Sequence, residues 1–205
     1  MRKVYLLIVL ALLINSCRPL VNKVIFKVYG IKKPRVENAE SIKKKAHKFG
    51  LDTNNIVTVH SDYFGRTLKG QSIPDAHIFD SSGRYIEYKK ADTSCNAGLF
   101  SFIPELAKDK TYFKIDSPSL SLQLAKFRDL NGKTLKPLEA ADYYVLIYWT
   151  VWTGRLNKDH VKIWEELAAA NKNCKIKVIK VNLDLQEYWD KEKRDKIIKA
   201  LQKKK

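Results

Sequence analysis

Several residue patterns typical of enzymes are missing from this chain of 205 residues. It has three cysteines, no zinc-type spacing of cysteine or histidine, no glycine-rich phosphate loop and no serine-hydrolase motif. No two histidines are spaced as metal ligands on a helix would be; the four are His47, His60, His77 and His160. The neighbours Asp159 and His160 resemble a dyad, but a solvated helix face explains them better. We therefore expect no metal, no cofactor and no catalytic residue of these classes.

Acidic residues are also scarce, with 22 Asp and Glu against 39 Lys and Arg, which gives a formal net charge of +17. Only 8 of the basic residues are arginine, the side chain best shaped to bind phosphate through two parallel hydrogen bonds. The lysines are spread along the chain and accompany no nucleic-acid-binding motif. We therefore expect no nucleic acid partner. Attraction to anionic lipid headgroups, at about 1 kcal/mol per lysine near the surface, explains the charge better.

The N-terminal apolar run is too short to cross a bilayer, which needs roughly 20 apolar residues. Residues 4–14 are apolar apart from the Tyr5 hydroxyl, and they follow the positive charges of Arg2 and Lys3. A short apolar core behind two positive charges predicts a secretory signal.

The end of that segment, Leu13-Ile14-Asn15-Ser16-Cys17, resembles a bacterial lipobox. The resemblance implies that residues 1–16 are a signal peptide and that Cys17 is acylated with chains such as palmitate. Residues 17–22 would form the lipidated tether, because two or more acyl chains give stable anchoring. The expected location is extracytoplasmic, at an outer membrane and facing the periplasm. The alternative is an ordinary signal anchor with an incidental cysteine.

The most informative absence is that of cysteine from residues 144–156, which read Tyr-Val-Leu-Ile-Tyr-Trp-Thr-Val-Trp-Thr-Gly-Arg-Leu. This apolar strand and tryptophan-rich turn resemble the active site of the thioredoxin-like thiol oxidoreductases, whose two tryptophans match Trp149 and Trp152. Thr153 and Leu156 occupy the two cysteine positions, and neither can supply the thiolate that disulfide exchange requires. The degenerate turn consists of Trp152, Thr153, Gly154, Arg155 and Leu156.

Hydrophobic periodicity predicts strands at 23–29, 56–60, 144–149 and 175–183, and helices at 37–49, 100–106, 157–170 and 191–201. Residues 72–88 carry two apolar runs around an Asp-Ser-Ser-Gly sequence, which predicts a β-hairpin. The hairpin resembles the one that follows the cis-proline of thioredoxin-like folds, and Pro74 is the candidate cis-proline. Residues 111–118 are predicted to be a linker.

These elements predict an α/β protein with a thioredoxin-like fold. We expect two βαβ-based thioredoxin-like lobes, at residues 23–110 and 119–205, the first with the hairpin and the second with the degenerate turn. No hairpin follows Asp184 in the second half. One thioredoxin-like sheet in permuted order, shared by both halves, is therefore the alternative.

The expected function is binding of a protein or peptide partner by a membrane-anchored lipoprotein that is redox-inactive at the usual site. Trp152 and Arg155 would line the groove, because tryptophan and arginine often anchor interfaces. Thr153 would cap the helix that follows. The alternative is a divergent thiol-disulfide oxidoreductase that uses Cys95, Cys174 or both. Whether these two cysteines form a disulfide stays open, because the sequence does not fix their separation.

Overall fold

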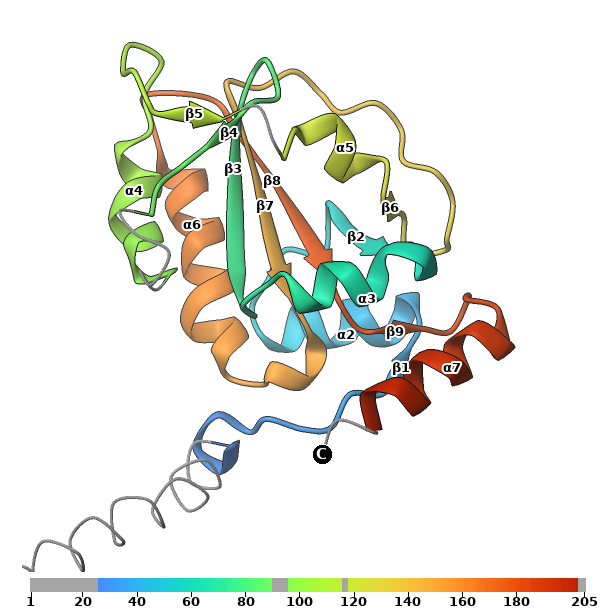
Figure 1. Cartoon of the computed structure of the whole chain (residues 1–205). Helices are drawn as coiled ribbons and strands as arrows, with labels where there is room; N and C mark the ends of the chain where they lie inside the picture. The colour runs from blue at the N-terminus through green and yellow to red at the C-terminus, as the bar shows by residue number, and fades with distance from the viewer. Residues whose placement is uncertain (1–25, 90–95, 116–117, 203–205) are drawn as a thin grey trace, which may run out of the picture.

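A computed structural model describes residues 26–89, 96–115 and 118–202 (Figure 1). The protein is an α/β protein built on one mixed seven-stranded sheet, in the order β5-β4-β3-β7-β8-β2-β6. The strands are β2 (Ile56–Val59), β3 (Asp75–Asp80), β4 (Tyr85–Ile86), β5 (Lys114–Ile115), β6 (Phe127–Arg128), β7 (Tyr143–Trp149) and β8 (Ile176–Asn182). A separate parallel pair joins β1 (Val36–Glu37) to β9 (Leu185–Gln186).

The central strand is β7, which pairs in parallel with β8 and antiparallel with β3. All seven of its residues are buried. Tyr143, Val145, Ile147 and Trp149 enter the core on one face, whereas the three residues between them enter the core on the other. This alternation follows from the two-residue period of a strand. A strand buried on both faces is a continuous apolar run, which made residues 144–149 recognisable in the sequence.

Helices cover both faces of this sheet (Figure 1). The core on one face includes side chains from α2 (Ala39–Lys48), α4 (Leu99–Glu105) and α6 (Ile163–Ala170). The core on the other face includes side chains from α3 (Ser61–Lys69), α5 (Leu120–Leu124) and α7 (Lys191–Gln202). The chain therefore forms three layers, as expected for a sheet whose two faces must both be removed from water.

The prediction of two separate lobes is wrong, because both halves of the chain contribute strands to the same sheet. From the second half, β7 and β8 lie between β2 and β3 of the first half. A lobe made from residues 23–110 alone would leave the inner edges of β2 and β3 unpaired, and unpaired sheet edges promote association with other strands. Pairing across the halves removes both edges.

Several local predictions also need correction. Residues 26–29 are helical instead of extended, and the side chains of Phe26 and Val28 are exposed, so this segment does not contribute a buried strand. The predicted linker contains β5, which pairs with β4. The predicted helix at 157–170 begins with a π-helical stretch, Asn157–Lys162, that continues into α6. Helix α3 was not predicted; the His60 side chain caps it by accepting a hydrogen bond from the Asp62 N–H.

Candidate functional site

The degenerate turn leaves the C-terminal end of β7 and is fixed by buried polar side chains. The Thr153 hydroxyl lies 2.8 Å from the Thr150 carbonyl oxygen and 3.1 Å from Asn157 Oδ1. The Asn157 amide also donates to the Thr150 carbonyl, at 2.8 Å. Thr153 is 2% exposed, and it forms no capping hydrogen bond with the following helix. Thr153 therefore holds the turn together from the inside.

A second segment of backbone lies against the outside of the turn. We call residues 29–32 the strap. The Lys32 N–H donates to the Trp152 carbonyl at 2.8 Å, and the Arg155 N–H donates to the Tyr29 carbonyl at 2.7 Å. Gly154 has φ +60°, and a Cβ atom there would collide with the carbonyl oxygens of the strap. Glycine is thus required for the turn's conformation and for the close approach of the strap.

A buried carboxyl group lies beneath the same turn. Asp184 Oδ2 accepts hydrogen bonds from the Val151 N–H and from the Asn182 amide, each at 2.7 Å. Its Oδ1 atom is buried and has no hydrogen-bond partner among the described residues. Burial raises the pKa of Asp184 to about 7, although both hydrogen bonds act in the opposite direction. Sequence reasoning missed this residue; the available signal was an acidic side chain directly after a long apolar strand.

On the other side of the turn, Trp152 forms part of an apolar cleft of about 570 Å³. Ile73, the residue before Pro74, lines the same cleft, and the Ile73–Pro74 peptide bond is cis. Helices α3 and α7 supply most of the remaining apolar wall. The lining side chains are Lys33, Pro34, Phe64, Leu68, Gln71, Ile73, Trp152, Leu183, Leu185, Ile198 and Leu201. The structure therefore brings the predicted turn and the predicted proline segment to one cavity.

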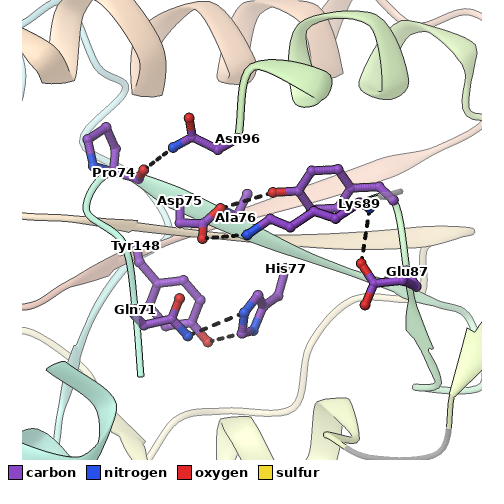
Figure 2. Close-up of polar contacts among 10 residues, drawn as sticks. Gln71, Pro74, Asp75, Ala76, His77, Glu87, Lys89, Asn96 and Tyr148 are labelled. Carbon is purple, nitrogen blue, oxygen red and sulfur yellow. Dashed lines mark hydrogen bonds and ion pairs between the residues drawn. The ribbon is translucent and has the colours of Figure 1, made fainter. Parts of the chain in front are cut away.

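A polar cluster follows Pro74 at the start of β3 (Figure 2). The buried Asp75 accepts hydrogen bonds at Oδ1 from the Ala76 N–H, at 2.8 Å, and from the Tyr88 hydroxyl, at 3.0 Å. Its Oδ2 atom forms an ion pair with Lys89 Nζ at 3.2 Å. Asn96 donates a hydrogen bond to the Pro74 carbonyl. Both oxygens of Asp75 are thus satisfied, which fits a structural role.

His77 lies two residues after Asp75 in β3, beside Tyr148 (Figure 2). Gln71 Nε2 lies 3.3 Å from its Nε2 atom, and the Tyr148 hydroxyl lies 3.5 Å from its Nδ1 atom. Burial lowers the pKa of His77 to about 4, so the imidazole is neutral near pH 7. The ring packs edge-on against Phe79, Tyr85 and Tyr148. This environment is that of a core histidine.

Cys174, the one cysteine among the described residues, does not supply a thiol at the turn. Cys174 lies just before β8, at the opposite end of the parallel β7–β8 pair from the turn. Seven strand residues at roughly 3.3 Å each separate the two ends by about 20 Å. Cys174 Sγ lies 3.3 Å from the Leu106 carbonyl oxygen, and burial raises the pKa of the thiol. Cys17 and Cys95 lie outside the described residues, and so does any bond between Cys95 and Cys174.

The accessible side chains of the turn provide no nucleophile. Its exposed or half-buried members offer an indole, a guanidinium and the Leu156 side chain, none of which is a nucleophile. Within residues 26–89, 96–115 and 118–202, no group of three His, Cys, Asp or Glu side chains is arranged to hold a metal ion. No helix in these ranges has the length and hydropathy needed to cross a membrane.

No family model, curated protein or solved structure matches this chain. The geometry of the turn, the cleft and the proline segment is therefore the basis for assigning a function.

Proposed function

We propose that this protein is a lipoprotein, anchored through an acylated Cys17, whose thioredoxin-like domain binds a protein or peptide partner without redox chemistry at the degenerate turn. It would act on the extracytoplasmic side, at an outer membrane facing the periplasm. The partner would enter the apolar cleft beside Trp152. The fold would be a single thioredoxin-like sheet in permuted order, with β2 and the β3–β4 hairpin ahead of the turn-bearing strand in the chain.

The relative position of the turn and Pro74 supports the thioredoxin-like assignment. Asp75, directly after Pro74, is paired in register with Tyr148, and the turn begins just after Trp149. Proline and turn therefore lie at the same end of two neighbouring strands. In the family that the sequence resembles, the turn and the cis-proline likewise flank one groove. The strand β8 lies on the other side of β7, and it follows the helix that leaves the turn.

One observation carries the binding proposal: Trp152 and Ile73 line the same apolar cleft, at a turn that has no thiol. Ligand sites are concave, mostly apolar and furnished with a few polar groups. This cleft fits that description, since Lys33 and Gln71 are the only polar side chains among the described residues that line it. A large indole on the wall of an apolar cavity is a common anchor for a partner.

The proposal is tested by photocross-linking the full-length protein in its native membranes. A photoreactive phenylalanine analogue replaces Leu68, which lines the cleft, or Leu122, which is 60% exposed and lies outside it. We expect a discrete adduct from position 68 and none from position 122. Trp152→Ala should abolish the adduct while thermal unfolding stays close to that of the parent, because the indole is only half buried.

The cysteine variants separate this function from the thiol alternative. Cys95→Ser and Cys174→Ser should leave the adduct unchanged, whereas an adduct that requires either thiol would favour a divergent oxidoreductase. Cys17→Ser should move the protein out of the membrane fraction. The intact mass of this variant should lack the acyl chains. Cross-linking at position 68 that survives Trp152→Ala would contradict the role given to the turn.

A further inference from the structure

A second cavity, of about 250 Å³, lies on the other side of Trp152 and is strongly basic. We call it the basic pocket. Lys33 and Trp152 also line the apolar cleft, so the two cavities adjoin. The residues that line the basic pocket are Tyr29, Gly30, Lys32, Lys33, Arg35, Glu37, Lys45, Lys48, Phe49, Val151, Trp152, Gly154 and Arg155. Six of these carry a positive charge and only Glu37 carries a negative one.

The basic side chains come from three separate places in the chain. Lys32 and Lys33 lie at and just after the strap, and Arg35 directly precedes β1. Lys45 and Lys48 lie in the last turn of α2. Arg155 belongs to the degenerate turn. Backbone hydrogen bonds hold the strap to the turn, and the β1–β9 pairing fixes the chain after Arg35. The pocket is therefore assembled by the fold instead of by one lysine-rich run.

Most of these charges have no counter-ion. Among the described residues, no acidic side chain lies within 4 Å of the charged groups of Lys32, Lys33, Arg35, Lys45 or Lys48. Arg155 is the exception, because its Nε atom lies 3.4 Å from Asp159. Glu37 forms no ion pair with a described residue, although it lines the same pocket.

A structural role explains only part of the cluster. Lysines in the last turn of a helix interact favourably with its dipole, and this accounts for Lys45 and Lys48. Lys32, Lys33 and Arg35 lie outside helices and gain no such stabilisation. Like charges held close together repel one another and destabilise the folded chain. A site that concentrates positive charge in spite of this repulsion is typical of a surface that binds anions.

We propose that the basic pocket binds the phosphate of an anionic phospholipid headgroup. A phosphate diester offers a full negative charge and two free oxygens to surrounding ammonium and guanidinium donors. The choice of a lipid as the source of the phosphate rests on the proposed function, since an anchor at Cys17 places the pocket close to headgroups. Phosphate binding itself does not depend on that function.

The test uses the full-length protein in neutral detergent micelles, titrated with short-chain phosphatidylglycerol, short-chain phosphatidylcholine or inorganic phosphate. Binding is followed through the amide NMR signals of Gly30 and Gly154, both of which line the pocket. Phosphatidylglycerol should shift both signals in a saturable way, whereas phosphatidylcholine, whose headgroup has no net charge, should not. Inorganic phosphate should compete weakly.

A matched pair of variants separates the pocket from the net charge. Lys45→Glu/Lys48→Glu reverses two pocket lysines, and Lys43→Glu/Lys44→Glu reverses two exposed lysines of the same helix outside the pocket. Each lysine near an anionic lipid contributes about fivefold in affinity, so losing the pocket pair alone should weaken binding about thirtyfold, and reversing its charge should weaken binding further. The Lys43/Lys44 variant should weaken binding much less, although the two variants have equal net charge.

Each outcome decides the proposal. Equal weakening by both variants, or no shift with any phosphate, would overturn the pocket as a site. Binding of inorganic phosphate without phosphatidylglycerol would overturn the lipid source and assign a free phosphate ester. An acidic peptide is titrated in the same way, and tighter binding of this peptide than of either phosphate would assign a protein partner instead. None of these variants alters an apolar wall of the cleft, so failure here leaves the cross-linking result at position 68 intact.

Discussion

Asp75 and Asp184 are two buried carboxyl groups at the same end of the sheet, and they are satisfied very differently. They are 3% and 2% exposed, respectively. Asp75 uses both oxygens, with two hydrogen bonds on one and the Lys89 ammonium on the other. Asp184 uses one oxygen for both of its hydrogen bonds and leaves the other without a described partner. Burial alone therefore does not determine how many partners the two oxygens of a carboxyl group have.

The difference assigns different roles to the two carboxyl groups. The Asp75 cluster fixes the start of β3 behind Pro74 and is a closed set of partners. The Asp184 group accepts a hydrogen bond from the backbone of the degenerate turn and, with a pKa of about 7, is about half protonated at pH 7. A carboxyl group with a perturbed pKa beside a cavity is a feature of functional sites as well as of structural networks. The predictions below test this contrast.

The largest expected effect is the pH dependence contributed by Asp184. Its pKa is raised from 3.8 to about 7 in the folded protein. The folded state then holds more protons than the unfolded state between these values, so stability is greatest at low pH and is lost as pH rises through 7. Asp184→Asn should remove this dependence and raise the free energy of unfolding at pH 8 by up to about 4 kcal/mol.

This prediction is measured by urea unfolding of wild type and variant between pH 4 and pH 8. His77 contributes the opposite dependence of stability on pH, because its lowered pKa makes stability fall as pH drops from 6.5 towards 4. It is present in both proteins, so the difference between them isolates Asp184. Asp195→Asn, at an exposed position of α7, serves as the control and should leave the curve unchanged. A stability difference between wild type and Asp184→Asn that does not vary with pH would refute the raised pKa of Asp184.

Asp75→Ala should have the next largest effect, in the destabilising direction. Removing the carboxylate leaves the Tyr88 hydroxyl and the partly buried Lys89 ammonium without their partner. Breaking a buried pair from one side typically costs 3–5 kcal/mol, and the 26% exposure of the Lys89 side chain places this case near about 3 kcal/mol. Chemical denaturation at pH 7 checks the value. If Asp75→Ala lowers the free energy of unfolding by less than Tyr88→Phe does, the Asp75 cluster is not a closed set of partners.

Tyr88→Phe should cost less, about 2 kcal/mol, because it removes one hydrogen bond to a charged acceptor and keeps the ring. The ring packs near Phe102, at 5.9 Å between centroids, and this contact should persist. The measurement is again denaturant unfolding. A double variant with Asp75→Ala should be much less destabilised than the sum of the two changes, since both remove the same interaction.

Thr153→Val should have the smallest effect, about 1 kcal/mol, because the hydroxyl contributes a neutral hydrogen bond and valine nearly preserves the shape. Binding through the cleft should persist, since Trp152 and Ile73 are untouched. The measurement combines thermal unfolding with cross-linking from position 68. Loss of the adduct with unchanged stability would mean that the Thr153 hydroxyl is needed for binding and not only for the turn.

Features encoded by neighbouring residues could be predicted from the sequence. The run 144–149 and the tryptophan-rich turn are local patterns, and the structure has a strand and a turn there. The hairpin around Gly83 is also local; Asp80 accepts hydrogen bonds from the N–H groups of Ser82 and Arg84, and Gly83 has φ +82°. Helix α4 follows the apolar spacing of residues 100–106 with a shift of one residue.

Features that depend on distant residues were not predictable in this way. Which strand lies beside which is a long-range choice, and short strands such as β2 and β6 carry little information about their partners. Lys180 stands where the alternation of β8 predicts an exposed residue, yet it is buried. Its charge is accommodated by an ion pair with Glu165 of α6. The strap binds through backbone groups, which have no side-chain signature apart from Gly30 and Gly154. Asp184 was missed because its burial depends on the fold of the turn above it.

The hydrogen bonds between the strap and the turn also set how far the binding cleft can be from an anchor at Cys17. Eleven residues lie between Cys17 and Tyr29, and the twelve Cα–Cα steps that join these two residues span at most about 43 Å when fully extended. Because Tyr29 is fastened directly to Arg155, the rest of the domain adds almost nothing to this reach. If Cys17 carries the proposed anchor, a proposed partner of the cleft would be a membrane neighbour, or would present its binding segment within a few nanometres of the lipid surface.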